Sequence, residues 1–171
     1  LNDRLFIVGD DEDNQLRIYD CNRFDKPIQT LSLSNLFKGV IKDGEDLEVD
    51  IESMATINHV LFIIGSHSTS RTGEYRPARH RLIALQFKLD ANKKLTVNPI
   101  GEIYTQLIDS LKQDSRFNNY QFDKAEKLPP KAIGGLSIEG LASTPDNGLL
   151  IGFRNPLSGG KIDKDRLIGG K

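Results

Sequence analysis

Two carboxylates recur in the same local sequence and are the first candidates for chemistry. Glu52 and Glu139 each follow an isoleucine, and an alanine stands three residues after each glutamate. Hard cations such as Ca²⁺ are bound by several oxygen ligands. Equivalent glutamates on neighbouring strands therefore have two interpretations. They bind a shared divalent cation, or they accept backbone hydrogen bonds and pair with an arginine.

Further carboxylates stand in an acidic run over residues 10–14. Asp10 and Asp11 are candidate ligands of the same ion as the two glutamates. The run does not match an EF-hand loop, because the sixth residue counted from Asp11 is Leu16 and the twelfth is Asn22. It is consistent with a solvated acidic hairpin loop and with a contribution to a metal site.

The loop over residues 66–80 collects basic side chains, among them His67, Arg71 and Arg79. Guanidinium groups bind phosphate and carboxylate in a bidentate manner, so this loop and Arg154 predict a site for a small anionic ligand. The structural alternative is that the arginines neutralise nearby carboxylates. His67 is the candidate for proton transfer, since histidine titrates near neutrality, and a plain hydrogen-bonding role is its alternative. The candidate catalytic residues are thus His67, Arg71 and Arg154.

The composition excludes several classes of protein. The 23 Lys and Arg residues and 24 Asp and Glu residues give a net charge of −1, which does not favour nucleic acid or anionic membranes. The apolar runs are too short to cross a bilayer. A single cysteine, Cys21, excludes an internal disulfide. The chain begins within an expected strand, so we expect a fragment of a longer protein. The absence of a visible targeting segment therefore leaves a cytoplasmic and a periplasmic location both open.

The first glutamate lies in a segment, residues 43–103, whose pattern predicts four consecutive strands. Short runs rich in apolar residues are separated here by polar turn and loop residues, as between strands. Four antiparallel strands in sequence make one blade of a β-propeller. The predicted strands are Ile51–Thr56, Val60–Gly65, Arg81–Lys88 and Thr96–Tyr104.

Residues 1–42 and 131–171 resemble incomplete copies of this unit. The first predicts strands at Leu5–Gly9, Gln15–Asp20 and Gln29–Leu33, followed by a helical turn around residues 34–37. The last predicts two strands and lacks a third and a fourth. We expect Gly9, Gly65 and Gly152 to end equivalent strands.

Between the last two units, residues 104–130 predict an inserted amphipathic helix, because Leu107, Ile108 and Leu111 have helical spacing. The predicted fold class is therefore all-β: a single partial β-propeller of four-stranded antiparallel blades, about three in this chain. The remaining blades are expected from the parent chain. In a propeller, the loops at residues 10–14 and 66–80 and the glutamates would lie on one rim.

Several of these motifs together resemble a bacterial family of predicted propellers without assigned activity, the domain of unknown function 3616. The resemblance covers most of the chain outside the helical insertion. It is carried by residues 8–20, Asp50-Ile51-Glu52, Ile64-Gly65-Ser66-His67-Ser68, Arg79-His80-Arg81-Leu82, Ile138-Glu139-Gly140-Leu141-Ala142 and Gly152-Phe153-Arg154-Asn155-Pro156.

More distantly, residues 138–142 are similar to the inner-strand motif of esterase-like phytases and calcium-dependent lactonase propellers. That resemblance implies that Glu139, and by repetition Glu52, bind a central calcium ion. Two functions follow as expectations. One is a propeller that binds a ligand or a protein partner at its polar rim. The other is a metal-dependent hydrolase of phosphoesters or lactones, in which Glu52, Glu139 and Asp10 or Asp11 hold the ion, His67 moves protons, and Arg71 and Arg154 bind substrate.

Overall fold

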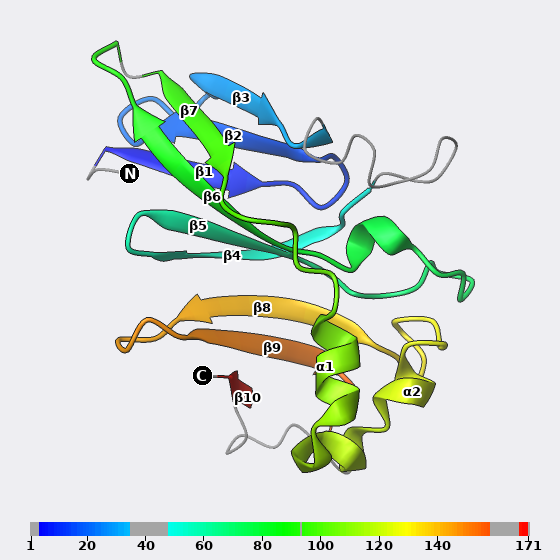
Figure 1. Cartoon of the computed structure of the whole chain (residues 1–171). Helices are drawn as coiled ribbons and strands as arrows, with labels where there is room; N and C mark the ends of the chain where they lie inside the picture. The colour runs from blue at the N-terminus through cyan, green and yellow to red at the C-terminus, as the bar shows by residue number, and fades with distance from the viewer. Residues whose placement is uncertain (1–3, 35–47, 93, 158–167, 171) are drawn as a thin grey trace.

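The computed structural model describes residues 4–34, 48–92, 94–157 and 168–170, and its strands form three antiparallel sheets (Figure 1). The prediction of an all-β chain with a helical insertion is confirmed. Most of the helical turn expected around residues 34–37 lies outside the described residues.

The central sheet has four strands in chain order, and all four predicted strands are present. Its hairpin turn at Asn58 and His59 has positive φ at both residues, as the tight turns that match strand twist require. The fourth strand is shorter than predicted: it ends at Pro99, and Tyr104 makes only an isolated bridge to Leu82. The strands are β4 (Ile51–Ile57), β5 (Val60–Gly65), β6 (Leu82–Leu89) and β7 (Leu95–Pro99).

Each of the flanking sheets has three strands. The first contains β1 (Leu5–Gly9), β2 (Gln15–Asp20) and β3 (Gln29–Ser32), as predicted. The last contains β8 (Ser137–Ser143), β9 (Leu149–Asn155) and β10 (Ile168–Gly170). The prediction that the last unit lacks a third strand was therefore wrong, because β10 pairs antiparallel with β9. Its glycine-rich sequence carries no strand pattern.

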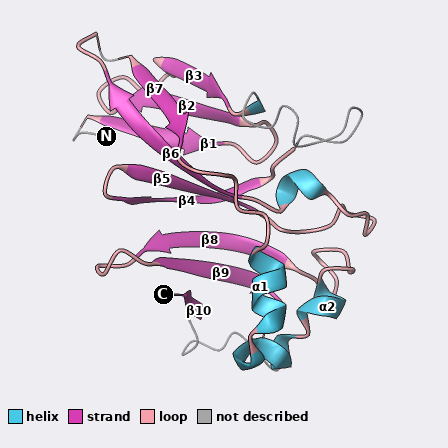
Figure 2. Cartoon of the chain, viewed as in Figure 1, coloured by secondary structure: helices cyan, strands magenta, loops and turns pink. Residues whose placement is uncertain are grey.

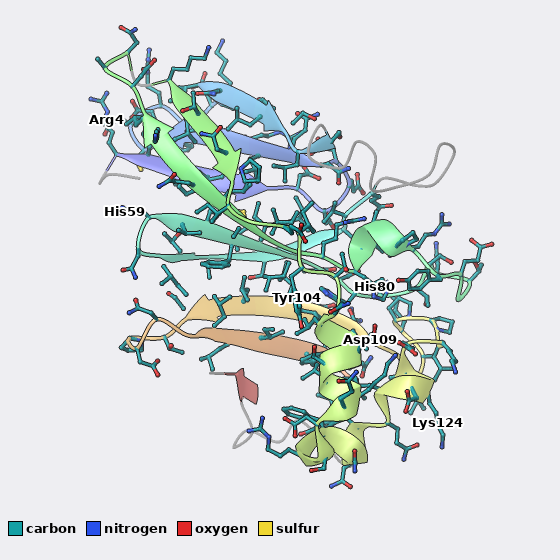
Figure 3. All side chains as sticks on the ribbon, in the orientation of Figure 1. Arg4, His59, His80, Tyr104, Asp109 and Lys124 are labelled. Atoms are coloured by element: carbon teal, nitrogen blue, oxygen red, sulfur yellow. The ribbon has the colours of Figure 1, made fainter. Side chains whose placement is uncertain are left out.

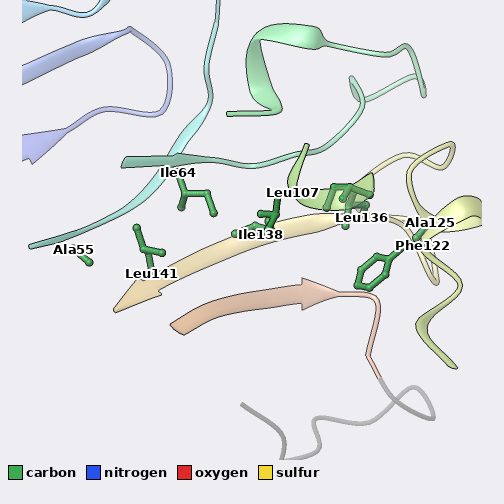
Figure 4. Close-up of a cluster of buried hydrophobic side chains, with 9 residues drawn as sticks. Ala55, Ile64, Leu107, Phe122, Ala125, Leu136, Ile138 and Leu141 are labelled. Atoms are coloured by element: carbon green, nitrogen blue, oxygen red, sulfur yellow. The ribbon is translucent and has the colours of Figure 1, made fainter. Parts of the chain in front are cut away.

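The three sheets are stacked face to face in chain order, with the four-stranded sheet in the middle (Figure 1). Leu16 of the first sheet packs with Leu61 and Ile83 of the central sheet in one buried cluster. A second cluster joins the central sheet to β8 through Ile64 and Ile138 (Figure 4). The apolar alternation of each strand thus supplies one layer of a continuous core. In the described residues the sheets do not close into a ring, so the propeller stays a prediction.

The insertion forms three short helical pieces beside β8 and β9 (Figure 2). They are α1 (Leu107–Gln113), the 3₁₀ helix η3 (Ser115–Tyr120) and α2 (Phe122–Ala125). Leu107 and Ile108 are buried in the second cluster, as their spacing predicted. The single expected helix is interrupted at Asp114, which takes an extended conformation and caps η3 by accepting the backbone N–H of Arg116. No helix of the described chain is long and apolar enough to cross a membrane.

The internal repeat is visible in the β4–β5 and β8–β9 hairpins. Their strand pairing is irregular between Ile51 and Ser53 and between Ile138 and Gly140, so each glutamate lies at a β-bulge. The two turns lie side by side, because the Asn58 side chain donates to Asn147 Oδ1 at 3.2 Å.

The glycines do not match in the predicted way. Ile51 pairs with Gly65, whereas its counterpart Ile138 pairs with Phe153. Gly65 therefore lies opposite the isoleucine of its repeat, whereas Gly152 stands one residue before the residue that does so. Gly152 instead lies opposite Gly140, and a Cβ on Gly140 would be 3.4 Å from the Cα of Gly152.

Gly65 is required by close backbone contacts, which gives a first prediction. A Cβ there would lie 2.4 Å from the carbonyl oxygen of Arg79 and 2.5 Å from that of Val49. We expect Gly65→Ala to lower the free energy of unfolding by about 2–4 kcal/mol, measured by urea unfolding. In Gly9→Ala the new Cβ meets only side-chain atoms of Ile51 and Met54, so that control should cost less than about 1 kcal/mol. Equal losses of stability in the two variants would contradict the conclusion that backbone contacts require glycine at position 65.

Candidate functional site

The two recurring glutamates lie near the first residues of β4 and β8, where β-bulges re-aim their side chains. A single residue joins these two strand starts. Ser66 donates its backbone N–H to the carbonyl of Asp50 at 3.0 Å and accepts the N–H of Ile138 at 2.9 Å. Glu52 and Glu139 are therefore neighbours in space, as the repeat predicted, and Glu139 acts on the pKa of Glu52.

Arg79 fixes one side of this region. Its guanidinium pairs with Asp50 at 2.9 Å and with Glu48 at 3.2 Å, and it also donates to the Ser68 hydroxyl and the Thr69 carbonyl. Asp50 has a φ of 55°, a conformation that costs energy in a residue other than glycine. The ion pair with Asp50 offsets that cost. The guanidinium of Arg79 is therefore occupied by carboxylates of the protein itself.

Arg154 approaches from β9. Its Nη1 donates to Glu139 Oε1 at 2.6 Å, across the strand pair, and both side chains are nearly half exposed. The sequence alternative in which a glutamate pairs with an arginine therefore holds for Glu139. Arg154 is in place to neutralise a carboxylate, while its predicted role in binding substrate stays a prediction.

Glu52 is the carboxylate whose charge is least compensated. Burial, together with the nearby charges of Asp50, Glu139 and Asp11, raises the pKa of Glu52 to about 7, and Arg154 offsets only part of this. Desolvation and like charges both favour the protonated form of a carboxyl group. A half-buried carboxyl group that titrates near neutrality has a strong electrostatic preference for a positive charge beside it.

The acidic hairpin loop is mostly a structural element. Arg17 of β2 pairs with Asp10 at 3.2 Å and also with Asp13, and Asp10 Oδ1 accepts the N–H of Glu12. Asp11 is exposed. The sequence analysis missed Arg17, although its place in β2, close to the acidic turn, was a usable signal.

The predicted metal ligands do not form a ready coordination site. Over the described ranges, no three His, Cys, Asp or Glu side chains are arranged to hold a metal ion. Asp10 is engaged by Arg17 and Glu139 by Arg154, so these donors are already paired with cations. Among the described residues, Glu52, Glu139, Asp10 and Asp11 are not gathered into a three-donor cluster, so calcium binding by this set stays a prediction.

His67 is enclosed within the protein. It is fully buried, and its Nδ1 lies 2.9 Å from the Gly65 carbonyl, which makes Nδ1 the protonated nitrogen. Burial lowers the pKa of His67 to about 4. Its neighbour His80, near Asp109 and α1 in Figure 3, has its pKa lowered to about 3, mainly by burial. A buried neutral imidazole is poorly placed for proton transfer at an open rim, so the hydrogen-bonding alternative is favoured.

The loop over residues 66–80 is unusually polar for a buried segment. Residues 66–70 are all buried, and Ser66 and Ser68 share a hydroxyl–hydroxyl hydrogen bond of 2.8 Å. Arg71 follows them on the exposed part of the loop. Sequence reasoning named the basic residues of this loop but missed Ser66, because its role depends on backbone groups, which carry no side-chain signal.

Comparison with known proteins identifies one family. The family described as "Protein of unknown function (DUF3616)" matches residues 1–98 and 84–161. No curated protein and no solved structure matches the chain.

The buried histidines predict a loss of stability in mild acid. His67 binds a proton near pH 6.5 in the unfolded chain but only near pH 4 in the folded protein. The free energy of unfolding should therefore fall as the pH drops from 6.5 to 4, by at most about 1.4 kcal/mol per pH unit for this residue.

Urea unfolding over this pH range measures the effect. His67→Asn keeps a residue that tolerates positive φ and should flatten the slope, whereas the exposed turn variant His59→Asn should not. An unchanged slope in His67→Asn would contradict the burial argument.

The raised pKa of Glu52 acts in the opposite sense. The folded protein holds this proton up to about pH 7, whereas an ordinary glutamate releases it near 4.5, so Glu52 costs stability as the pH rises between these values. Glu52→Gln should be more stable than the unchanged protein above pH 7, by about 1 kcal/mol after allowance for solvent screening, and equal to it below pH 4.5. Thermal melting of both proteins, with the exposed Glu102→Gln as control, tests this. A gain that persists at low pH would point to packing instead.

Proposed function

We propose that this chain, which belongs to the family of proteins of unknown function DUF3616, is a binding module that takes a positively charged group of a ligand beside Glu52. The observation that carries the proposal is the pKa of Glu52 near 7, caused by burial among Asp50, Glu139 and Asp11. A cation placed there would favour the ionised form of the carboxyl group and offset the repulsion of its neighbours.

The surroundings suit a ligand larger than an ion. A hollow of about 620 Å³ adjoins Glu139 and Arg154 and is lined by Gly140, Gly152 and Phe153 as well. The paired glycines leave the backbone of β8 and β9 open to close approach. A ligand with an ammonium group can place this group at Glu52 and its apolar part in the hollow, with the Arg154–Glu139 pair between them.

The arrangement favours a cation over the small anion that the sequence suggested. Arg79 is paired with Asp50 and Glu48, and Arg154 with Glu139, so these two guanidinium groups serve carboxylates of the protein. The anionic ligand and the protein partner remain untested predictions.

Binding is also favoured over the metal-dependent hydrolysis of phosphoesters or lactones. The hydrolase hypothesis requires an ion at the carboxylates, and the described donors do not form such a site. It also requires a titrating His67, whose pKa is lowered to about 4 in a buried position. We also propose that the stacked sheets belong to a β-propeller in which β4 and β8 are innermost strands.

Isothermal calorimetry with putrescine, CaCl₂ and MgCl₂ as separate probes tests the proposal near neutral pH. We expect putrescine to bind with release of protons, because Glu52 is partly protonated there, so the measured heat should depend on the ionisation heat of the buffer. Glu52→Gln should weaken binding at least about ten-fold, with Glu102→Gln unchanged. Calcium binding that requires Glu52, without putrescine binding, would favour the hydrolase hypothesis. If neither putrescine nor the metal ions bind, the proposed cation site is wrong.

A further inference from the structure

Over the described residues, the first sheet has no strand in the place that β4 occupies in the central sheet. In the central sheet, β5 is bonded on one side to β6 and on the other to β4. In the first sheet, β1 corresponds to β5 and β2 to β6, and β1 is the end strand over the described residues. The position that corresponds to β4 is therefore beside the outer edge of β1.

The hydrogen-bond alternation of β1 identifies the groups on that edge. The N–H of Cys21 donates to the Arg4 carbonyl at 2.8 Å, so these two residues form a hydrogen-bonded pair of the β1–β2 ladder. Such pairs alternate with pairs whose N–H and C=O groups point to the other side. Phe6 and Val8 thus bond to β2, whereas Ile7 and Gly9 direct their backbone groups away from it.

The same alternation in β5 shows what these groups are placed to do. Gly65 donates to the Arg81 carbonyl at 3.0 Å, so Phe62 and Ile64 direct their backbone groups toward β4. There they pair with Ala55 and Ser53. Ile7 and Gly9 of β1 therefore occupy the places that Phe62 and Ile64 hold in the central sheet.

A groove of about 350 Å³ lies beside β1 and the central sheet, and it is lined by residues of β4, β5 and β6 as well as β1. Its walls include Leu5 and Ile7 of β1 and Met54 and Thr56 of β4. The strands come close at the other end of β1, where a Cβ on Gly9 would lie 3.4 Å from the Met54 sulfur. A strand added to β1 would pack its apolar side chains against this wall, much as β8 packs against the other face of the central sheet.

We propose that the edge of β1 and this groove accept one extended strand of the same type as β4 and β8, antiparallel to β1. The occupant is defined by the repeat: it is an Ile-Glu strand with apolar residues at alternate positions, supplied by a further repeat unit. Backbone pairing gives affinity in such strand addition, and the pockets for alternate side chains give specificity. Small apolar molecules would leave the N–H groups of Ile7 and Gly9 unbonded. The proposal goes beyond cation binding and does not depend on it.

A synthetic, capped peptide of residues 50–57, which contains β4 and the preceding Asp50, serves as the probe. We expect amide hydrogen exchange of Ile7 and Gly9, followed by NMR, to slow at least about ten-fold at saturating peptide. The amides of Phe6 and Val8, which already bond to β2, should change much less.

Two modified peptides leave the protein unaltered and sharpen the test. N-methylation at the residues equivalent to Ser53 and Ala55 removes the N–H groups that would bond to β1 and should abolish the effect. N-methylation at the Met54 equivalent should preserve it. The Glu52→Gln protein should still bind the peptide, which separates this proposal from the cation site. Unchanged exchange at Ile7 and Gly9 with millimolar peptide, or equal slowing at Thr30 on the far edge of the sheet, would overturn the proposal.

Discussion

The backbone of Ser66 is the constraint on which the rest of the site depends. Its N–H and C=O groups bond to Asp50, which precedes β4, and to Ile138, which lies at the start of β8. Because both contacts are made by backbone groups, the side chain of Ser66 takes no part in holding the two strand starts together. The lack of a side chain at Gly65 lets Arg79 and Val49 approach closely enough for the contact to form.

Electrostatic balance explains why so many carboxylates are tolerated in a small region. Each of three arginines compensates a different group: Arg17 the hairpin aspartates, Arg79 the start of β4, and Arg154 the glutamate of β8. Glu52 lies between these pairs and has no ion pair with comparable geometry among them. The unbalanced negative charge of the region therefore acts mainly on the pKa of this one carboxyl group.

The sequence predicted the parts of this structure that depend on local pattern. Gln15–Asp20 alternates clearly, Leu5–Gly9 and Val60–Gly65 are short apolar runs that end in glycine, and the repeat of Ile-Glu placed Glu52 and Glu139 together. The strand β10 was missed, because Gly169 and Gly170 give no apolar alternation. The burial of His67 was missed for a different reason: a loop of serines and threonines reads as exposed, and only the packing of β8 against it shows otherwise. The pairing of Arg17 with Asp10 was missed although Arg17 lies in an alternating strand directly after the acidic turn, a position from which it can reach back to that turn.

The hydrogen bond between the side chains of Asn58 and Asn147 has a mechanical consequence. The β4–β5 and β8–β9 hairpins are joined at one end by these turn residues and at the other by Ser66. Two attachments at opposite ends prevent one hairpin from sliding along the other. The spacing of Glu52 and Glu139 is therefore held from both ends, so a ligand at the proposed site would have to match this spacing.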